Sequence, residues 1–251
     1  MKVTPSISLF PIPGIPLITP QDDLALVINK CAQKIGLELK DGVLVVAQKV
    51  ISKAEDRLVS MSKVTPSEKA REIAREDEKD PRHMEVVLQE SEAIVRHGNR
   101  VLITETRHGF VCANAGVDLS NAPGEDIAVL LPLNPDESAK QLRKGLEELG
   151  GQRLAVVITD TFGRPWREGI VDVAIGSSGI APIDDFRGQT DLAGRELVVT
   201  TAATVDQLAA AAGMLMQKDS GIPAVWVTGV PGTGEGCVAD LIRNPSEDLF
   251  R

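Results

Sequence analysis

The sequence of 251 residues predicts an α/β or α+β fold with mixed sheets and flanking helices. Two observations predict it. Residues 100–106 and 110–113 are strand-like and surround a short turn at residues 107–109, which is typical of an antiparallel hairpin. Other apolar runs, at residues 43–46 and 154–158, alternate with helix-like segments, which is typical of strands joined through helices. The two kinds of connection together indicate mixed sheets.

The first half of the chain contains three predicted helices. Residues 22–35 carry apolar side chains at helical spacing, and the next residue is a glycine placed to end that helix. Residues 42–47 then form a predicted buried strand. The sequence Thr65-Pro66-Ser67-Glu68 is a capping box with Pro at the first helical position, so it predicts the start of a charged helix. Asp80-Pro81 ends that helix and begins another, which is expected to continue through Ile94.

The second half continues the alternation after the hairpin. Residues 134–150 form a predicted helix that an Asn-Pro pair caps and a glycine ends, and the strand at residues 154–158 follows. Thr204-Val205-Asp206-Gln207 is a second capping box, which predicts an Ala-rich helix through Met216. A last strand is expected at residues 224–228.

Composition excludes several classes of partner. The 36 acidic and 27 basic residues give a formal net charge of −9, which disfavours contact with nucleic acid. The absence of tyrosine and an aromatic content of 3% argue against stacking platforms for single strands. No signal-like segment or bilayer-length apolar run is present, so we expect a cytoplasmic protein without membrane contact. Three separated cysteines without a CxxC predict neither disulfides nor a zinc site.

The most informative segment begins with the apolar run at residues 154–158, which is expected to deliver Thr159-Asp160-Thr161 into a turn. The turn continues over residues 162–169 and contains Arg164 and Arg167. A carboxylate, hydroxyls and two arginines on one loop supply hard oxygen ligands for a metal ion and cations that pair with phosphates. A protein with a net negative charge that binds anionic substrates needs basic side chains or metal ions near the binding site.

Asp160 is interpreted as a metal ligand. Phosphatases with a nucleophilic Asp after an apolar strand use a second Asp two positions later for acid–base work, and that position is Phe162 here. Residues 114–121 form another predicted tight loop that presents Asp118 and Asn121, although such residues are also ordinary turn formers. Two carboxylates and the Thr161 hydroxyl, on separate loops, could share a magnesium or manganese ion bound to phosphates.

Three further segments bear on a ligand site. In the segment at residues 49–55, which directly follows a predicted buried strand, Lys49 and Lys53 could neutralise phosphate oxygens or could belong to a solvated charged loop. Residues 10–17 are stiff and nearly free of polar side chains, and could lie along a ligand or pack as an N-terminal strap. The glycines at residues 229–236 match neither common phosphate-binding pattern and are interpreted as a C-terminal turn.

Six motifs occur in order from about residue 10 to about residue 230. They are Pro13-Gly14-Ile15-Pro16-Leu17-Ile18, Val50-Ile51-Ser52-Lys53-Ala54-Glu55, Asn114-Ala115-Gly116-Val117-Asp118, Ile158-Thr159-Asp160-Thr161, Gly163-Arg164 and Gly194-Arg195-Glu196-Leu197. Together they resemble the coenzyme F420-0:L-glutamate ligase family in its stand-alone form, without the nitroreductase-like domain of some actinobacterial members. The resemblance implies one ligase domain over residues 1–251, composed of two intertwined subdomains from discontinuous segments.

The resemblance implies a GTP-dependent ligase that joins L-glutamate to the terminal carboxylate of the deazaflavin F420-0, with further γ-linked glutamates to follow. An acyl phosphate would form first, and attack by the glutamate amine would then release phosphate, leaving GDP as the other product. Such phosphoryl transfer depends on positioning and charge neutralisation more than on covalent chemistry from the protein. Mg²⁺ or Mn²⁺ at two sites, with potassium as a further ion, and a homodimer with its nucleotide groove near the interface are also implied.

The resemblance assigns roles to individual residues. Asp118 and Asp160 would hold one divalent cation, and Thr161 would bind a second. A larger set would contact GTP: Gly14, Ile15, Pro16, Leu17, Gln48, Lys49, Lys53, Asn121, Met216 and Gln217. We add Arg164 and Arg167 to Asp160 as catalytic candidates for the acyl phosphate or substrate carboxylates, although they could also be a surface pair on a long loop.

One segment departs from the family pattern. Archaeal members carry a longer, glycine-rich and acidic turn that supplies a ligand to the second metal. Here residues 216–220 form a shorter turn with a lysine near that position. Gln217 or Asp219 is expected to replace the missing ligand.

Other functions stay open on the residues alone. A metal-dependent phosphatase or phosphotransferase could use the Asp160 segment on another substrate. A nucleotide-binding module without catalysis is a different class, and a glutamate ligase could act on a folate-like or other acceptor.

Overall fold

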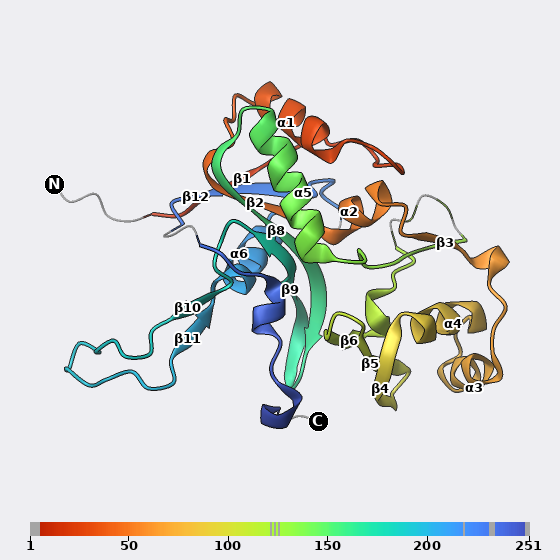
Figure 1. Ribbon diagram of the computed structural model, residues 1–251. Helices are drawn as coiled ribbons and strands as arrows, with labels where there is room; N and C mark the ends of the chain where they lie inside the picture. Colours follow the sequence, from red (N-terminus) through yellow and green to blue (C-terminus); the bar gives the residue numbers. More distant parts are fainter. Residues whose placement is uncertain are drawn as a thin grey trace.

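A computed structural model of the protein describes residues 6–120, 122, 124, 126–217, 219–230 and 234–248, and a five-stranded sheet lies at its centre (Figure 1). The strands, in spatial order, are β1 (Ser8–Pro11), β12 (Ala224–Thr228), β2 (Lys40–Ala47), β8 (Gln152–Arg164) and β9 (Arg167–Ser178). β2 and β8 are parallel, whereas the other three neighbouring pairs are antiparallel. The predicted mixed-sheet class is therefore confirmed.

The apolar runs of the sequence form the centre of this sheet. Val43–Val46 of β2 and Leu154–Ile158 of β8 are almost completely buried, as expected for strands covered on both faces. Trp226 of β12 is fully buried and lies against Gly42, where a Cβ atom would approach the indole ring to 2.6 Å. Gly42 therefore makes room for the largest side chain of the core.

Three helices pack around the central sheet. They are α1 (Leu24–Lys34), α5 (Pro135–Glu148) and α6 (Thr204–Gly213). α5 contacts β8 and β9, α1 lies beside α5, and α6 contacts β9. The Asp23 side chain caps the first of these helices and the Asn134 side chain caps the second, each by accepting a hydrogen bond from a backbone N–H group. The helices expected at residues 22–35 and 134–150 are thus confirmed.

A second hydrophobic cluster, which includes Met84 and Leu102, is built from residues 61–130. Figure 1 shows this part of the chain beside the central sheet. Its helices and strands are β3 (Leu58–Ser60), α3 (Glu68–Asp77), α4 (Pro81–Gln89), β4 (Ser91–Gly98), β5 (Val101–Thr106), β6 (Val111–Ala113) and β7 (Ile127–Val129). β5 and β6 form the predicted hairpin, and β4 extends it to three strands.

The remaining regular segments are short. They are α2 (Gln48–Ala54), β10 (Ile183–Asp185), β11 (Thr201–Ala203) and the 3₁₀ helices η1 (Met61–Lys63), η2 (Asn114–Gly116), η3 (Val238–Leu241) and η4 (Pro245–Glu247). β10 and β11 pair at the base of a long excursion that projects away from the central sheet (Figure 1). No described helix has the length and apolar character needed to cross a bilayer.

Two capping boxes predicted from the sequence are wrong in detail. Ser67, not Thr65, caps α3, because its hydroxyl accepts a hydrogen bond from the Ala70 N–H group at 3.2 Å. At α6 the cap position is Ala203, and Asp206 instead accepts a hydrogen bond from the Ala174 N–H group at 2.9 Å. The first error is a shift of the cap by two residues, and in the second a tertiary contact uses the Asp206 side chain that the local pattern assigned to the capping box.

Two helix ends were also predicted wrongly. The helix that begins at Pro81 ends at Gln89, because the following residues pair with β5 as strand β4. α6 ends at Gly213, three residues before the expected end. Of the two alternatives for residues 49–55, the solvated loop is wrong, since α2 begins directly after β2 and runs to Ala54.

Candidate active site

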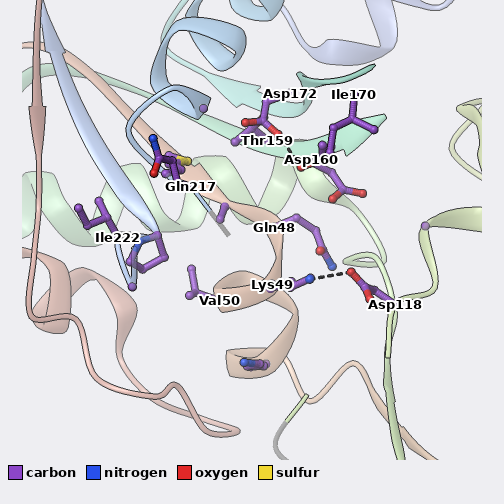
Figure 2. Close-up of a pocket in the computed structure, with 18 of the residues that line it drawn as sticks. Gln48, Lys49, Val50, Asp118, Thr159, Asp160, Ile170, Asp172, Gln217 and Ile222 are labelled. Carbon is purple, nitrogen blue, oxygen red and sulfur yellow. Dashed lines mark hydrogen bonds and ion pairs between the residues drawn. The ribbon is translucent and has the colours of Figure 1, made fainter. Parts of the chain in front are cut away.

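A cavity of about 970 Å³ opens where β2 ends, beside the continuing strand β8 (Figure 2). The carboxyl ends of parallel strands are where open α/β sheets place ligands. Its walls come from the strap after β1, from α2, from the segment after β6, from β8 and β9, and from the end of α6 with the turn that follows. Segments distant in the sequence therefore meet at one pocket.

Asp160 lies in a strand, not in the turn that the sequence predicted. β8 continues to Arg164 and pairs with β9, with Thr161 opposite Asp172. The pairing of β8 with β2 stops at Thr159, so the edge of β8 beyond that residue is open to the pocket. In the β8–β9 hairpin, the backbone N–H and C=O groups of this segment pair between the two strands. In the predicted turn they would have needed other partners.

The Asp160 carboxyl group is in an environment that disfavours its charge. Burial raises its pKa to about 6, and the nearby carboxylates of Asp118 and Asp172 act in the same direction. The Thr161 N–H group and the charge of Lys49 oppose this rise. Three carboxylates with one nearby lysine leave an excess of negative charge, which a divalent cation would neutralise.

Lys49 and Asp118 form an ion pair across the pocket, marked by a dashed line in Figure 2. The Lys49 Nζ atom lies 2.6 Å from Asp118 Oδ2 and 2.8 Å from Ser120 Oγ. The Ser120 N–H group also donates to Asp118 Oδ1 at 2.7 Å. Burial raises the pKa of Asp118, but the hydrogen bonds from Lys49 and Ser120 together bring it below the ordinary value. Asp118 is therefore an anion held in place.

Lys53 lies one helical turn after Lys49 on α2 and lines the same pocket. Its residue is only 7% exposed, and no hydrogen bond or ion pair to its ammonium group is seen within the described part of the chain. Burial, and to a smaller extent the charge of Lys49, lower the pKa of Lys53. Lys53 is therefore a pocket-lining cation without a described partner, so this position suits an anionic ligand.

Gln48 has a structural role at the pocket wall. Its Nε2 atom donates to Ser52 Oγ at 2.6 Å and to the Leu130 carbonyl oxygen at 3.0 Å, while the side chain is almost fully buried. These bonds fix the start of α2 against the segment that follows β7. They orient the helix that carries both lysines.

The strap and the turn after α6 complete the pocket. Ile15, Pro16 and Leu17 line it, whereas Gly14 does not and accepts a hydrogen bond from the Cys31 thiol. Met216 and Gln217 line the opposite part, and Asp219 does not. Of the two residues expected to replace the missing ligand, the structure brings Gln217 to the pocket.

Two predicted site residues lie away from the pocket, and a third is not among the described residues. Arg164 and Arg167 flank the end of the β8–β9 hairpin and do not line the pocket. Arg164 donates to the Glu168 carbonyl oxygen at 2.7 Å, which helps to close the hairpin. Asn121 lies outside the described residues.

Comparison with known proteins identifies the family. The sequence model of the F420-0:Gamma-glutamyl ligase family matches residues 14–229. The chain belongs to this family. Membership makes it an enzyme of the ligase class. Four of the six sequence motifs, those at residues 13–18, 50–55, 114–118 and 158–161, supply residues that line the pocket.

Relatives in three archaea are similar over nearly their whole lengths, and each is named coenzyme F420:L-glutamate ligase. The protein of Methanothermobacter thermautotrophicus is 44% identical over 98% of this chain and 99% of its own. That of Methanopyrus kandleri is 47% identical over 98% of each chain. That of Archaeoglobus fulgidus is 43% identical over 98% of this chain and 96% of its own.

The sequence interpretation of this family member missed two pocket residues. Asp172 accepts a hydrogen bond from Thr161 Oγ1 at 2.6 Å, and the strand pairing that aligns them is not visible in a local pattern. Asn114 also lines the pocket, and its buried Oδ1 atom has no hydrogen-bond partner among the described residues. Asn114, Ala115 and Gly116 have φ angles of 52°, 52° and 69°, and left-handed non-glycine residues often mark functional sites.

The donor atoms fit a divalent cation that also binds substrate oxygens. Asp118, Asp160 and Thr161 all line the pocket. Within the described ranges, no three His, Cys, Asp or Glu side chains lie close enough to hold a metal ion by themselves. Magnesium is commonly held by one or two carboxylates together with phosphate oxygens and water. The site has the composition of such a shared metal centre.

Proposed function

We propose that this protein is a GTP-dependent ligase that adds one or more L-glutamates to coenzyme F420-0 through an acyl phosphate. The observation that carries the proposal is that the ammonium group of Lys53, which has no hydrogen-bond or ion-pair partner among the described residues, belongs to a residue that lines the same pocket as Asp118 and Asp160. A cation on one wall and carboxylates on the other suit phosphates that arrive with a metal ion. The names of the relatives support the acceptor and the amino acid.

GTP would lie along the strap at residues 15–17 and over α2. Lys53 would neutralise its phosphate oxygens, and Gln217 would close the far side with Met216. Asn121 is included by family resemblance, and Gly14 supports the strap from behind. The apolar strap would exclude water from the site. Lys53 and the phosphates of GTP would then interact more strongly than they would in water.

Asp118 and Asp160 would hold one Mg²⁺ or Mn²⁺ ion, and Thr161 with Gln217 would hold a second; potassium is a further candidate. When bound, these ions would neutralise charge on the transferred phosphoryl group. The raised pKa of Asp160, due to burial and neighbouring carboxylates, supports this assignment because a cation would relieve both effects.

In the first step, a carboxylate oxygen of F420-0 attacks the γ-phosphorus of GTP, and the bond to GDP breaks. In the second, the neutral amine of glutamate attacks the acyl carbon, and phosphate leaves with the bonding electron pair. Arg164 and Arg167 are proposed to bind acceptor carboxylates. Arg164 lies four positions after Asp160 in the strand, or about 13 Å along it, so these arginines would act beyond the pocket.

The test combines phosphate release with mass spectrometry of the product. With GTP, Mn²⁺, glutamate and F420-0, the expected result is one phosphate released for each glutamate added. Phosphate release without glutamate or acceptor would indicate a phosphatase. Bound GDP without turnover would indicate a binding module, and turnover with a folate-like compound alone would indicate another acceptor.

We also propose a homodimer. The excursion between β10 and β11 exposes Leu192, Val198 and Val199, whose exposed fractions are 110%, 71% and 84%. Exposed apolar side chains gathered on one segment are typical of an interaction surface. Light scattering should give twice the chain mass of 26.8 kDa, and a particle of one chain mass would contradict the proposal.

A further inference from the structure

The β8–β9 hairpin brings Thr161 and Asp172 face to face. The two residues are paired across the strands, and Thr161 Oγ1 donates to Asp172 Oδ1 at 2.6 Å. Both line the same pocket as Asp160. Figure 2 shows Asp172 and Asp160 at this pocket. A short hydrogen bond to a carboxylate is a strong one, so the Thr161 hydroxyl has a defined orientation.

This hydrogen bond determines what the hydroxyl can do. A threonine hydroxyl has one hydrogen and two lone pairs. Because the hydrogen is given to Asp172, only lone pairs remain for a ligand in the pocket. Thr161 can therefore bind a cation, but it cannot donate to a phosphate oxygen while the bond to Asp172 persists. A carboxylate that orients a ligand and increases its electron density is a common partner in metal sites.

The second oxygen of Asp172 lies against Gly213, the last residue of α6. A Cβ atom at Gly213 would approach Asp172 Oδ2 to 1.8 Å and Cγ to 2.7 Å. The carboxylate could keep its position only if residue 213 has no side chain. The carboxyl end of a helix also carries partial negative charge, so this position does not itself stabilise an anion.

We propose that Asp172 is a positioning residue that makes the Thr161 hydroxyl a ligand for the divalent cation, and that Gly213 is required to leave space for its carboxylate. The inference rests on the proposed metal-dependent function. It adds Asp172 on β9 and Gly213 on α6, neither of which is itself a proposed metal ligand. It also explains why a carboxylate lies beside a helix end that offers it no favourable charge.

The test measures Mn²⁺ binding to the whole chain in saturating GDP, by the electron paramagnetic resonance signal of free Mn²⁺. Asp172→Ala should weaken binding at the Thr161 site roughly 10-fold to 100-fold. Asp172→Asn keeps an acceptor for the hydroxyl and should fall between Asp172→Ala and the wild type. Gly213→Ala should resemble Asp172→Ala, because its methyl group displaces the carboxylate, which is the movable end of a side chain.

Gly163→Ala is the matched control, since a Cβ atom there would meet no atom within 4 Å although the residue lies on the same hairpin. It should bind Mn²⁺ like the wild type, and thermal unfolding should show that all variants are folded. If Asp172→Ala and Gly213→Ala bind Mn²⁺ within about twofold of the wild type, the inference is overturned. A wild type that binds no Mn²⁺ would overturn the metal site as well, so the two failures are distinguishable. If Gly213→Ala does not fold, Mn²⁺ binding to the Asp172 variants alone tests the inference.

Discussion

Lys49 on α2 lies 2.6 Å from Asp118 on the segment after β6, and this ion pair joins the central sheet to the second hydrophobic cluster across the pocket. Among the described residues, no ion pair to Asp160 is seen, although the charge of Lys49 lowers its pKa. Lys53, one turn later, also lines the pocket and has no ion-pair partner in the described part of the chain. The pocket therefore has a carboxylate on β8 and an ammonium group on α2 that are both available to a ligand.

Asp160→Ala should reduce GTP-dependent glutamate addition by at least about 100-fold, because a metal ligand supplies several kcal/mol of charge stabilisation. The fold should persist, since the substitution relieves the repulsion from Asp118 and Asp172. Phosphate release and thermal unfolding check the two parts. Asp185→Ala, which removes an exposed carboxylate outside the pocket, should retain activity. Retained activity in Asp160→Ala would remove this residue from the mechanism.

Lys53→Ala should raise the GTP concentration for half-maximal activity by about 10-fold or more, because a hydrogen bond to a charged group contributes about 1.5–3 kcal/mol. Stability should change less, since the ammonium group has no hydrogen bond or ion pair to lose among the described residues. GTP titration and urea unfolding measure both quantities. Lys69→Ala, on an exposed part of α3, is the control. An unchanged GTP titration would count against the assignment.

Asp77 predicts a pH dependence of stability. Burial raises its pKa, but the His97 hydrogen bond at 2.9 Å and the charge of Lys79 bring the pKa below the ordinary value of 3.8. Because the folded pKa is lowered, the stabilisation is complete above pH 3.8 and is lost as the pH falls through the folded pKa. Asp77→Asn should therefore be less stable than the wild type at pH 7, by about 1–3 kcal/mol.

This difference in unfolding free energy should shrink as the pH falls below 3.8. Urea unfolding across that range measures it. Asp56→Asn is a suitable control, because Asp56 is exposed and its left-handed backbone also suits asparagine. A difference between wild type and Asp77→Asn that stays constant with pH would show that the carboxylate charge is not the cause.

Gly176→Ala should destabilise the protein by roughly 1–3 kcal/mol, as overpacking of a close contact does. A Cβ atom at this position of β9 would lie 2.4 Å from the Pro135 carbonyl oxygen at the start of α5, and backbone atoms cannot rotate away. Gly163→Ala on β8 meets nothing within 4 Å and should be nearly neutral. Equal thermal midpoints for the two variants would show that α5 can shift on the sheet.

The predictions from sequence succeeded where the signal was local. The apolar runs of β2 and β8 are buried on both faces, so their strands could be recognised from a few consecutive residues. α1 was predictable for a similar reason, because helical spacing and its end signals lie within the segment itself. β4 was missed, since its residues become a strand only by pairing with β5.

The site residues that could be predicted from the sequence are likewise those with a local signal. Asp118 and Asp160 could be chosen from the sequence because each belongs to a distinctive short motif, and the structure places both in one pocket. Arg164 and Arg167 were predicted to lie on the same loop as Asp160, because that segment was expected to turn directly after residue 158. The continuous strand carries them to the far end of the hairpin instead.

Short patterns in the sequence are enough to predict the mixed fold class, the family and the two carboxylates, because each pattern lies within one segment of the chain. The burial of the Lys53 residue and the hydrogen bond from Thr161 to Asp172 could be found only in the folded chain. Burial and strand register depend on residues far apart in the chain, and no local pattern contains them.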